Sequence, residues 1–431
     1  MKIDNVCYVR LTTLSSAAIF KKLNFSSQKT GCKVLEQRRH DIDWLRIISM
    51  LIIFFFHNAR FFDFMDWHLK NPEKSIGFQA LVGFLSQWLM PIFFLLSGAG
   101  SWFALGSRNF GQYVLDRVKR LLVPYYLIGF FILIPPQYYW EQVTHGRFSG
   151  DFFQFIPHYF HFPLNPQFVG FYLGFRPLFL AYWAGHLWFL HYLFILSLVA
   201  LPLSIYLKSE SGGKVIVRLA GLCHHRGGIY LFAVPVAVVQ MALRAAFPNY
   251  LWWADFAYWL IFFLIGYILP ADERFAQTIK QNGWVSLAIG VAATGLLLYL
   301  VFRRGYFEVW ERHPSYTVGY LGYQALRSLN TWCWIAFVLA VGTKFLNFSN
   351  KIQIYCNEAV LPFYILHQTM ILLIGFFVVQ WNLSIMLKYL IISTSSLVLI
   401  LAIYQLLIRR FKVIRFLFGM KTEKRPAKDP P

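Results

Sequence analysis

The stretch DIDWLRIISMLIIFFFHNARFF, residues 41 to 62, begins like a membrane-spanning helix but contains two polar side chains, Arg46 and His57. Eleven residues return an α-helix to within about 20° of its starting direction and advance it by about 16 Å. We therefore expect Arg46 near one membrane boundary and His57 deeper in the span, on the same helix face. Ionisable groups within a span are rare and are functional candidates by default.

The composition of the whole chain indicates an integral membrane protein. Of its 431 residues, 58% are apolar and 19% are aromatic, which is outside the usual range of soluble domains. No polar stretch long enough for a separate domain interrupts the apolar segments, so we predict one all-α polytopic bundle. We expect a cytoplasmic N-terminal extension over residues 1–40, a transmembrane domain over 41–408 and a basic cytoplasmic tail over 409–431.

About ten segments are apolar enough for helices of roughly 20 residues, the length that crosses a bilayer. These segments are residues 44–62, 79–104, 121–140, 186–207, 229–247, 250–270, 284–302, 328–346, 358–380 and 387–408. The aromatic segment 145–185 is broken by four prolines. We predict an ordered, partly interfacial loop there.

The distribution of positive charge predicts the orientation of the bundle. With the N-terminus in the cytoplasm, the inside segments contain 28 Lys and Arg residues and the outside segments nine. Short cytoplasmic loops carry this excess, so both termini are predicted on the cytoplasmic side of the cell inner membrane. Anionic lipid headgroups account for the net charge of +21, and we expect no nucleic-acid partner.

The two polar residues of the opening stretch suggest a particular chemistry. A neutral histidine in a helical bundle can accept a proton from a hydroxyl, which is the task of the general base in an acyl transfer. A cation on the same face, nearer the cytosol, suits an anionic donor such as a nucleotide-bearing thioester. The structural alternatives are that Arg46 anchors the helix end at the headgroups and that His57 bonds to a neighbouring helix.

Several later motifs occur in a fixed order after residues 43 to 57. They are MPIFFLLSGAG at residues 90 to 100, DRVKRLLVPYY at 116 to 126, GHLWFLHYLF at 185 to 194 and LPFYILHQ at 361 to 368. Together with DWLR at 43 to 46 and the R-x10-H spacing to His57, they resemble the membrane acyltransferase-3 family. This family includes sugar O-acyltransferases, among them glucan-succinylating members. Lys119 stands where an arginine is ordinary in the family.

The resemblance implies an enzyme that moves a small acyl group, acetyl or succinyl, from cytoplasmic acyl-CoA to a hydroxyl of a carbohydrate or lipid-linked glycan. Acyl-CoA is then a co-substrate, and no other cofactor or metal is expected. The implied catalytic residues are His57 and His367, and the implied donor-binding residues are Arg46, Arg117, Lys119 and Arg120. The implied supporting residues are Asp43, Ser97, Trp188 and Tyr364.

Each later motif also has a structural interpretation. Ser97 and Gly98 permit close helix packing, and Trp188 is an aromatic anchor at the membrane interface. The basic run at 117 to 120 suits lipid headgroups as well as donor phosphates. His186 and His191 point about 140° apart on a helix, so at most one is expected to face the site.

Two further functions remain open from the sequence. A transporter or lipid flippase could use Arg46 and His57 to bind an anionic substrate or to relay protons. A non-catalytic sensor that retains the family fold is the third hypothesis. Direct transfer and a covalent acyl-histidine relay are both compatible with the acyltransferase hypothesis.

Overall fold

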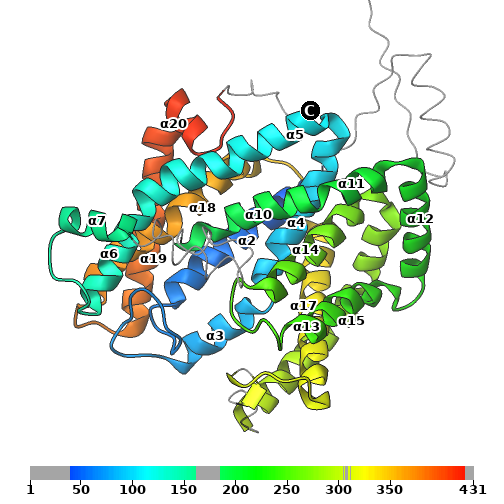
Figure 1. The fold of residues 1–431 in the computed structure, drawn as a ribbon, viewed down its shortest axis with the longest axis horizontal. Coiled ribbons are helices and arrows are strands. Elements are labelled where there is room, and N and C mark those ends of the chain that lie inside the picture. Colours follow the sequence, from blue (N-terminus) through cyan, green and yellow to red (C-terminus); the bar gives the residue numbers. More distant parts are fainter. Residues whose placement is uncertain (1–38, 162–184, 304, 306–308, 311, 423–431) are drawn as a thin grey trace, which may run out of the picture.

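A computed structural model describes residues 39–161 and 185–422, except 304, 306–308 and 311 (Figure 1). The described residues form helices and contain no strand. The helices are α2 (His40–Ala59), α3 (Ile76–Ser86), α4 (Leu89–Ser107), α5 (Phe110–Arg117), η1 (Val118–Leu122), η2 (Pro124–Leu133), α6 (Ile134–Thr144), α7 (Phe152–His161), η3 (Gly185–Leu187), α10 (Trp188–Val199), α11 (Leu201–Lys208), α12 (Glu210–His224), η4 (Gly228–Phe232), α13 (Ala233–Leu243), α14 (Trp253–Ile268), η5 (Leu269–Ala271), α15 (Glu273–Arg303), α17 (Val318–Phe345), α18 (Lys351–Val378), α19 (Ile385–Ile403), η6 (Tyr404–Ile408) and α20 (Lys412–Leu417).

The predicted polytopic bundle is confirmed. Eight helical segments of the described chain are long and apolar enough to cross a membrane, and a ninth is counted if α10 and α11, bent by 50°, form one span. Each of the ten predicted segments overlaps one helix or a run of two or three consecutive helices. The predicted segment 229–247 forms η4 and α13, which together are shorter than a full span.

The predicted loop over residues 145–185 is wrong in its first half, because residues 152–161 form helix α7. Asp151 and Gln154 cap its start reciprocally, with backbone N–H to side-chain oxygen distances of 2.9 and 3.2 Å. The aromatic side chains of α7 pack on α6, with the Phe155 ring 5.7 Å from Tyr139. Capping and aromatic packing thus outweigh the single backbone bond that Pro157 removes. Residues 162–184, and with them three of the four prolines, lie outside the described residues.

The span that contains the basic run is wound more widely than an ordinary α-helix. Residues Val118–Leu122 and Pro124–Leu133 are π-helical, a geometry that is rare and often occurs at functional sites. Pro124 has no N–H to donate to the preceding turn, which favours a local change of winding. The sequence predicted a span here but not its π-helical winding.

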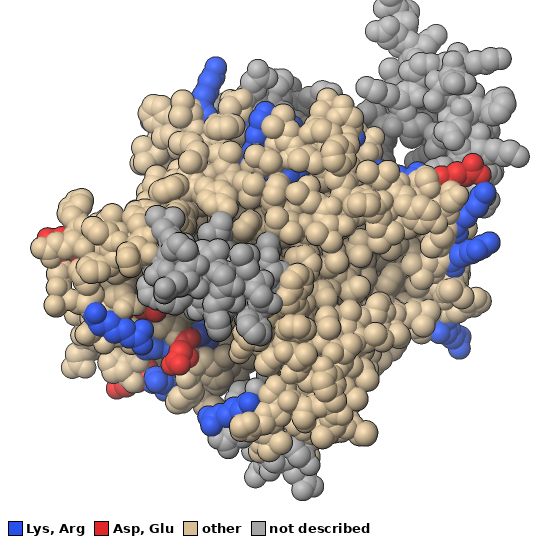
Figure 2. Space-filling view, viewed as in Figure 1, with Lys and Arg blue, Asp and Glu red and all other residues tan. Residues whose placement is uncertain are grey.

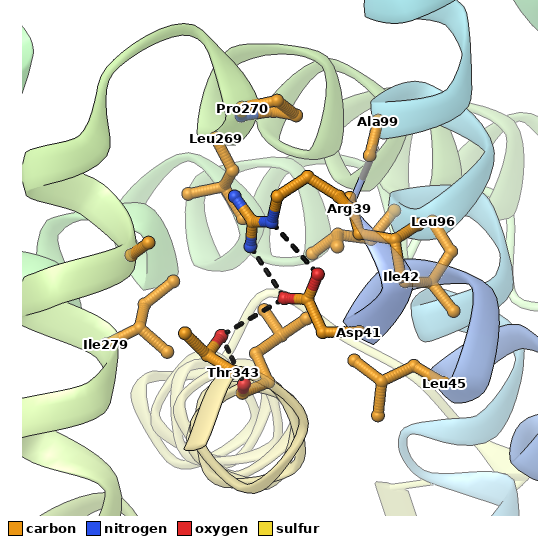
Figure 3. Close-up of a pocket in the computed structure, with 13 residues that line it drawn as sticks. Arg39, Asp41, Ile42, Leu45, Leu96, Ala99, Leu269, Pro270, Ile279 and Thr343 are labelled. Atoms are coloured by element: carbon orange, nitrogen blue, oxygen red, sulfur yellow. Dashed lines mark hydrogen bonds and ion pairs between the residues drawn. The ribbon is translucent and has the colours of Figure 1, made fainter. Parts of the chain in front are cut away.

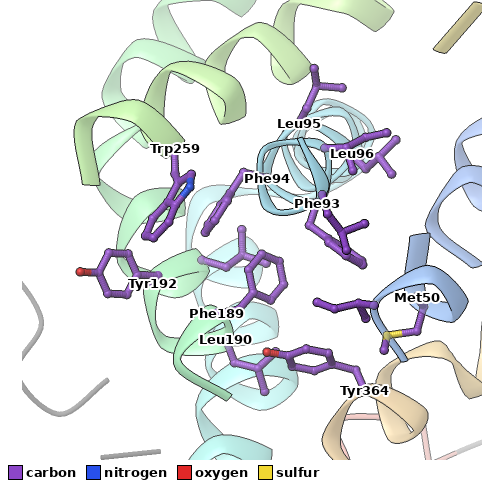
Figure 4. Packing of buried hydrophobic residues seen from close by; sticks show 14 of the residues in the cluster. Met50, Phe93, Phe94, Leu95, Leu96, Phe189, Leu190, Tyr192, Trp259 and Tyr364 are labelled. Atoms are coloured by element: carbon purple, nitrogen blue, oxygen red, sulfur yellow. The ribbon is translucent and has the colours of Figure 1, made fainter. Parts of the chain in front are cut away.

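Helices α4 and α14 pack unusually closely because glycines line their interface. A Cβ atom on Gly98 would lie 1.9 Å from the backbone oxygen of Phe263, and one on Gly266 would lie 1.9 Å from that of Leu95. The GAG segment after Ser97 therefore has the packing role that the sequence suggested. Around this contact, the rings of Phe94 and Trp259 stack at 5.2 Å within the aromatic core (Figure 4).

The two described chain ends lie at the same end of the bundle. Gln353, at the start of α18, donates to the backbone oxygen of His40 at 3.2 Å. Arg415 of α20 donates to Glu358, one turn further along α18, at 2.8 Å. Outside the grey residues, Figure 2 shows a broad area without Lys, Arg, Asp or Glu, with charged side chains around its margins. This distribution fits a hydrocarbon-facing belt between two polar ends.

Candidate active site

A pair of histidines links α2 and α18 in the interior of the bundle. Nδ1 of His57 lies 2.8 Å from Nε2 of His367, and the two rings stack at 5.0 Å. His367 is fully buried, whereas His57 is half-buried. The structure therefore brings together the two histidines that the sequence proposed as catalytic, although 310 residues separate them.

A third histidine, His186, completes the cluster from the turn η3. Its ring lies 4.8 Å from that of His367, at 86°. Its Nε2 lies 3.2 Å from the backbone oxygens of Tyr364 and Ile365, and the Tyr364 hydroxyl donates to the backbone oxygen of His186. His191 instead lies against Tyr125, with ring centroids 5.1 Å apart. The sequence spacing predicted that at most one of His186 and His191 faces the site, but it did not indicate which one.

The loop after α2 covers His57 with an indole ring. The Trp67 ring lies parallel to the His57 ring, with centroids 6.1 Å apart. Next to it, His68 bonds to Glu141 of α6. Both Trp67 and His68 are half-buried. The sequence gives no signal for these two residues, because they lie in a loop without a periodic pattern.

An ionic network holds that loop in place. The carboxylate of Asp63, which is fully buried, pairs with Arg60 and with Lys70. Burial lowers the pKa of Lys70, and the bond to Asp63 opposes this change. Asn71 accepts a hydrogen bond from Lys388 of α19 at 2.9 Å. The loop is thereby tied to α2 and to α19, which fixes the position of Trp67.

At the opposite end of α2, Arg46 pairs with the residue that precedes it by one turn. Its Nη1 lies 3.4 Å from Oδ1 of Asp43, and the supporting role of Asp43 stays a prediction. The Arg46 guanidinium lies beside Gly100 of α4, because a Cβ atom on Gly100 would be 3.5 Å from Nη2 of Arg46. Arg46 and His57 belong to one unbroken helix, so the predicted separation of about 16 Å along its axis holds.

Two arginines of the basic run lie near Arg46. Arg117 donates to Oγ of Ser101 at 2.6 Å, and the positive charges of Arg117 and Arg46 both act on Arg120. Arg120 and Lys119 are exposed. Lys119 makes no hydrogen bond or ion pair with a described residue. The structure thus gathers three of the four predicted donor-binding residues into a positive cluster.

Ser97 and Trp188 lie in the packing around the site. Oγ of Ser97 donates to the backbone oxygen of Phe93 at 2.7 Å, and Trp188 is buried and stacks on Trp259 at 4.7 Å. Within the described part of the chain, neither side chain bonds to His57 or His367. Trp188 therefore belongs to the aromatic core, while Tyr364 bonds directly to the His186 turn.

A separate pocket opens where α2 begins (Figure 3). Arg39 donates to both carboxylate oxygens of Asp41, at 2.9 and 2.7 Å, and Thr343 lies 3.5 Å from the same carboxylate. The rest of the lining is aliphatic. Because its charges neutralise each other, this pocket offers no catalytic group comparable to the histidine cluster. Among the described residues, no group of three or more His, Cys, Asp or Glu could hold a metal ion.

The described chain is an all-helical membrane bundle in which α2 contributes His57 to a histidine cluster and Arg46 to a positive cluster. These features define a candidate membrane-embedded transferase. The chain belongs to the acyltransferase-3 family, because the family model described as "Acyltransferase domain" matches residues 39–405. The resemblance found in the sequence is thereby confirmed, and the protein is a membrane acyltransferase.

Proteins with related sequences support the same assignment. The chain is 22% identical over 412 residues to "Glucans biosynthesis protein C" of Escherichia coli (strain SMS-3-5 / SECEC), covering 91% of this chain and 98% of that protein. The protein of the same name from Shigella dysenteriae serotype 1 (strain Sd197) is also 22% identical with the same coverage. No solved structure matches the chain.

Proposed function

We propose that the protein transfers a small acyl group, acetyl or succinyl, from cytoplasmic acyl-CoA to a carbohydrate hydroxyl, with His57 as the general base. The observation that carries the proposal is the contact of 2.8 Å between His57 and His367 in the bundle interior. His57 lies on the same helix as Arg46. A base in the interior and a cation at the helix start suit a donor that enters from one end and an acceptor that enters from the other.

The positive cluster suits the phosphates of the donor. The charges of Arg117 and Arg46 both repel that of Arg120, so a bound polyanion relieves that repulsion and gains charge-assisted hydrogen bonds. The thioester of acyl-CoA lies at the far end of a long flexible arm from the nucleotide phosphates. A donor held at Arg46 can therefore present its thioester further along α2, toward His57. For a cytoplasmic donor, we propose that the cluster faces the cytoplasm, in line with the distribution of Lys and Arg in the sequence.

The reaction needs one proton carrier. His57 takes the proton of the acceptor hydroxyl while the hydroxyl oxygen attacks the thioester carbonyl carbon. The tetrahedral intermediate then collapses, the carbon–sulfur bond breaks, and the leaving thiolate receives the proton from the His57 imidazolium. The products are a carbohydrate ester and free CoA, and the histidine returns to its neutral form.

The proposed acceptor is a glucan or a lipid-linked glycan, in line with the names of the related proteins. Trp67 and the His68–Glu141 pair lie on the side of His57 away from Arg46. An indole ring packs against the apolar face of a sugar ring, and the polar pair offers partners for sugar hydroxyls. The half-exposed loop is therefore the proposed route of the acceptor.

The proposal is tested with purified protein reconstituted in liposomes, with labelled acetyl-CoA or succinyl-CoA on one side and glucan present. The expected result is label in the glucan as an ester that hydroxylamine cleaves, with release of one CoA per ester. Liposomes with the His57→Ala variant provide the control. Label that accumulates in the lumen without esterified glucan would contradict the proposal and favour the transporter hypothesis.

A further inference from the structure

One backbone carbonyl of α18 accepts hydrogen bonds from two imidazole rings. The oxygen of Tyr364 lies 2.6 Å from Nδ1 of His367 and 3.2 Å from Nε2 of His186. A carbonyl oxygen only accepts, so each of these ring nitrogens carries a hydrogen. In a neutral imidazole one nitrogen donates and the other accepts, and the partner of one nitrogen thereby determines the state of the other.

We propose that His367 is a positioning residue that holds the His57 proton on Nδ1 and so makes Nε2 of His57 the reactive base. Because Nδ1 of His367 donates to Tyr364, Nε2 of His367 is an acceptor. It lies 2.8 Å from Nδ1 of His57, which must therefore donate. The remaining nitrogen of His57, Nε2, then carries the free lone pair.

The other proton arrangements are disfavoured by the same distances. If His367 carried its proton on Nε2, the lone pairs of Nδ1 and of the Tyr364 oxygen would face each other at 2.6 Å. If His367 carried both protons, a positive charge would occupy a fully buried ring that forms no ion pair with any described residue. Burying an unpaired charge costs far more than a hydrogen bond returns.

This role rests on the proposed function, since it assigns the atom through which His57 acts. When Nε2 of His57 accepts the hydroxyl proton, the ring becomes an imidazolium. Its Nδ1–H then donates a charge-assisted hydrogen bond to the neutral Nε2 of His367. His367 thus orients the base and stabilises its charged form, as a carboxylate does in other catalytic groups.

His186 packs against the ring of His367 and is itself bonded to α18. It bonds to α18 in both directions, because its Nε2–H donates to the Tyr364 backbone oxygen and its own backbone oxygen accepts from the Tyr364 hydroxyl. Its ring lies nearly perpendicular to that of His367. Gly185 permits this turn with a φ of +50°, a conformation that suits glycine.

Two variants of His367 separate its bonding role from its bulk. His367→Gln retains an acceptor oxygen for the His57 Nδ1–H, whereas His367→Leu fills space without one. We expect His367→Leu to lower kcat about 100-fold with little change in the KM for acyl-CoA, and His367→Gln to stay within about tenfold of the original kcat. His191→Gln, which alters a buried histidine outside the cluster, is the control and should keep the original kcat.

The protonated nitrogen is measured directly by ¹⁵N NMR of histidine-labelled protein in lipid nanodiscs, with the His57 signal assigned by its loss in His57→Gln. The expected result is a neutral His57 protonated at Nδ1, and a change of this state in His367→Leu but not in His191→Gln. A His57 protonated at Nε2 in the original protein would overturn the inference even if acyl transfer occurs. If His57 has the expected tautomer but the protein transfers no acyl group, the result counts against the proposed function and not against this inference. Equal kcat values for His367→Leu and His367→Gln would overturn the positioning role.

Discussion

Replacing Gly98 by alanine should disrupt the contact between α4 and α14, although it adds only one methyl group. The new Cβ would lie 1.9 Å from the backbone oxygen of Phe263, about 1.5 Å short of ordinary van der Waals contact, which begins at 3.4 Å. Neither side chain rotation nor solvent can relieve a clash with backbone. The two helices must separate, which opens the aromatic core on both sides of the contact.

The expected cost lies at the upper end of the range for overpacked cores, about 3 kcal/mol. At roughly 2 °C per kcal/mol for a large chain, the melting temperature should fall by about 6 °C. The measurement is a thermal unfolding scan of the purified protein in detergent, read by intrinsic tryptophan fluorescence.

A matched control is Gly295→Ala in α15, because a Cβ there meets nothing within 4 Å. Alanine has the higher helix propensity, so this variant should melt at the original temperature or slightly above it. Gly266→Ala meets Leu95 of the same interface at 1.9 Å, and the double variant with Gly98→Ala should lose less than the sum of the two. If Gly98→Ala and Gly295→Ala melt at the same temperature, the proposed close packing is wrong.

Three further predictions concern the donor, the acceptor and the orientation of the bundle. Arg46→Gln should weaken binding of a non-hydrolysable acyl-CoA analogue by about 10-fold or more, as expected for a lost charge-assisted bond, and unchanged affinity in calorimetric titration would return Arg46 to an anchoring role. Trp67→Ala should raise the KM for the glucan acceptor several-fold while leaving the KM for acyl-CoA unchanged, and an equal rise in both would show that the loop supports the whole site. In a background without native cysteines, a cysteine at the exposed position Ser149 should react with an impermeant thiol reagent in intact cells and one at the exposed position Ser211 should not; the reverse pattern would place the donor site on the wrong side.

The sequence predicted most of the helices because membrane spans have a strong compositional signal. Apolar runs of the required length mark each span, and the spacing of Arg46 and His57 on one helix follows from helical periodicity alone. Local exceptions were missed where tertiary contacts decide the outcome. Residues 152–161 are helical despite Pro157 because a capping box and aromatic packing stabilise the helix.

The contacts within the site could be predicted only in part. The sequence indicated both His57 and His367, the first by its position on the opening helix and both by the resemblance. Their contact depends on how α2 packs against α18, which no local pattern specifies. The place of His186 depends on the turn at Gly185 and on two bonds to Tyr364. Trp67 is held by the buried Asp63 network, and a loop of this kind has no periodic signal.

The most direct test of the account is acyl transfer by the purified His57→Ala variant in liposomes, measured together with its binding of the acyl-CoA analogue and its melting temperature. Removing the general base should lower kcat by about 100-fold or more. The affinity for the acyl-CoA analogue should stay close to that of the original protein. The melting temperature should also change little, since one imidazole contributes only on the order of 1 kcal/mol of stability. A well-folded variant that retains more than about a tenth of the original rate would contradict the assignment of His57 as the base. Such a loss is smaller than the removal of a general base should cause.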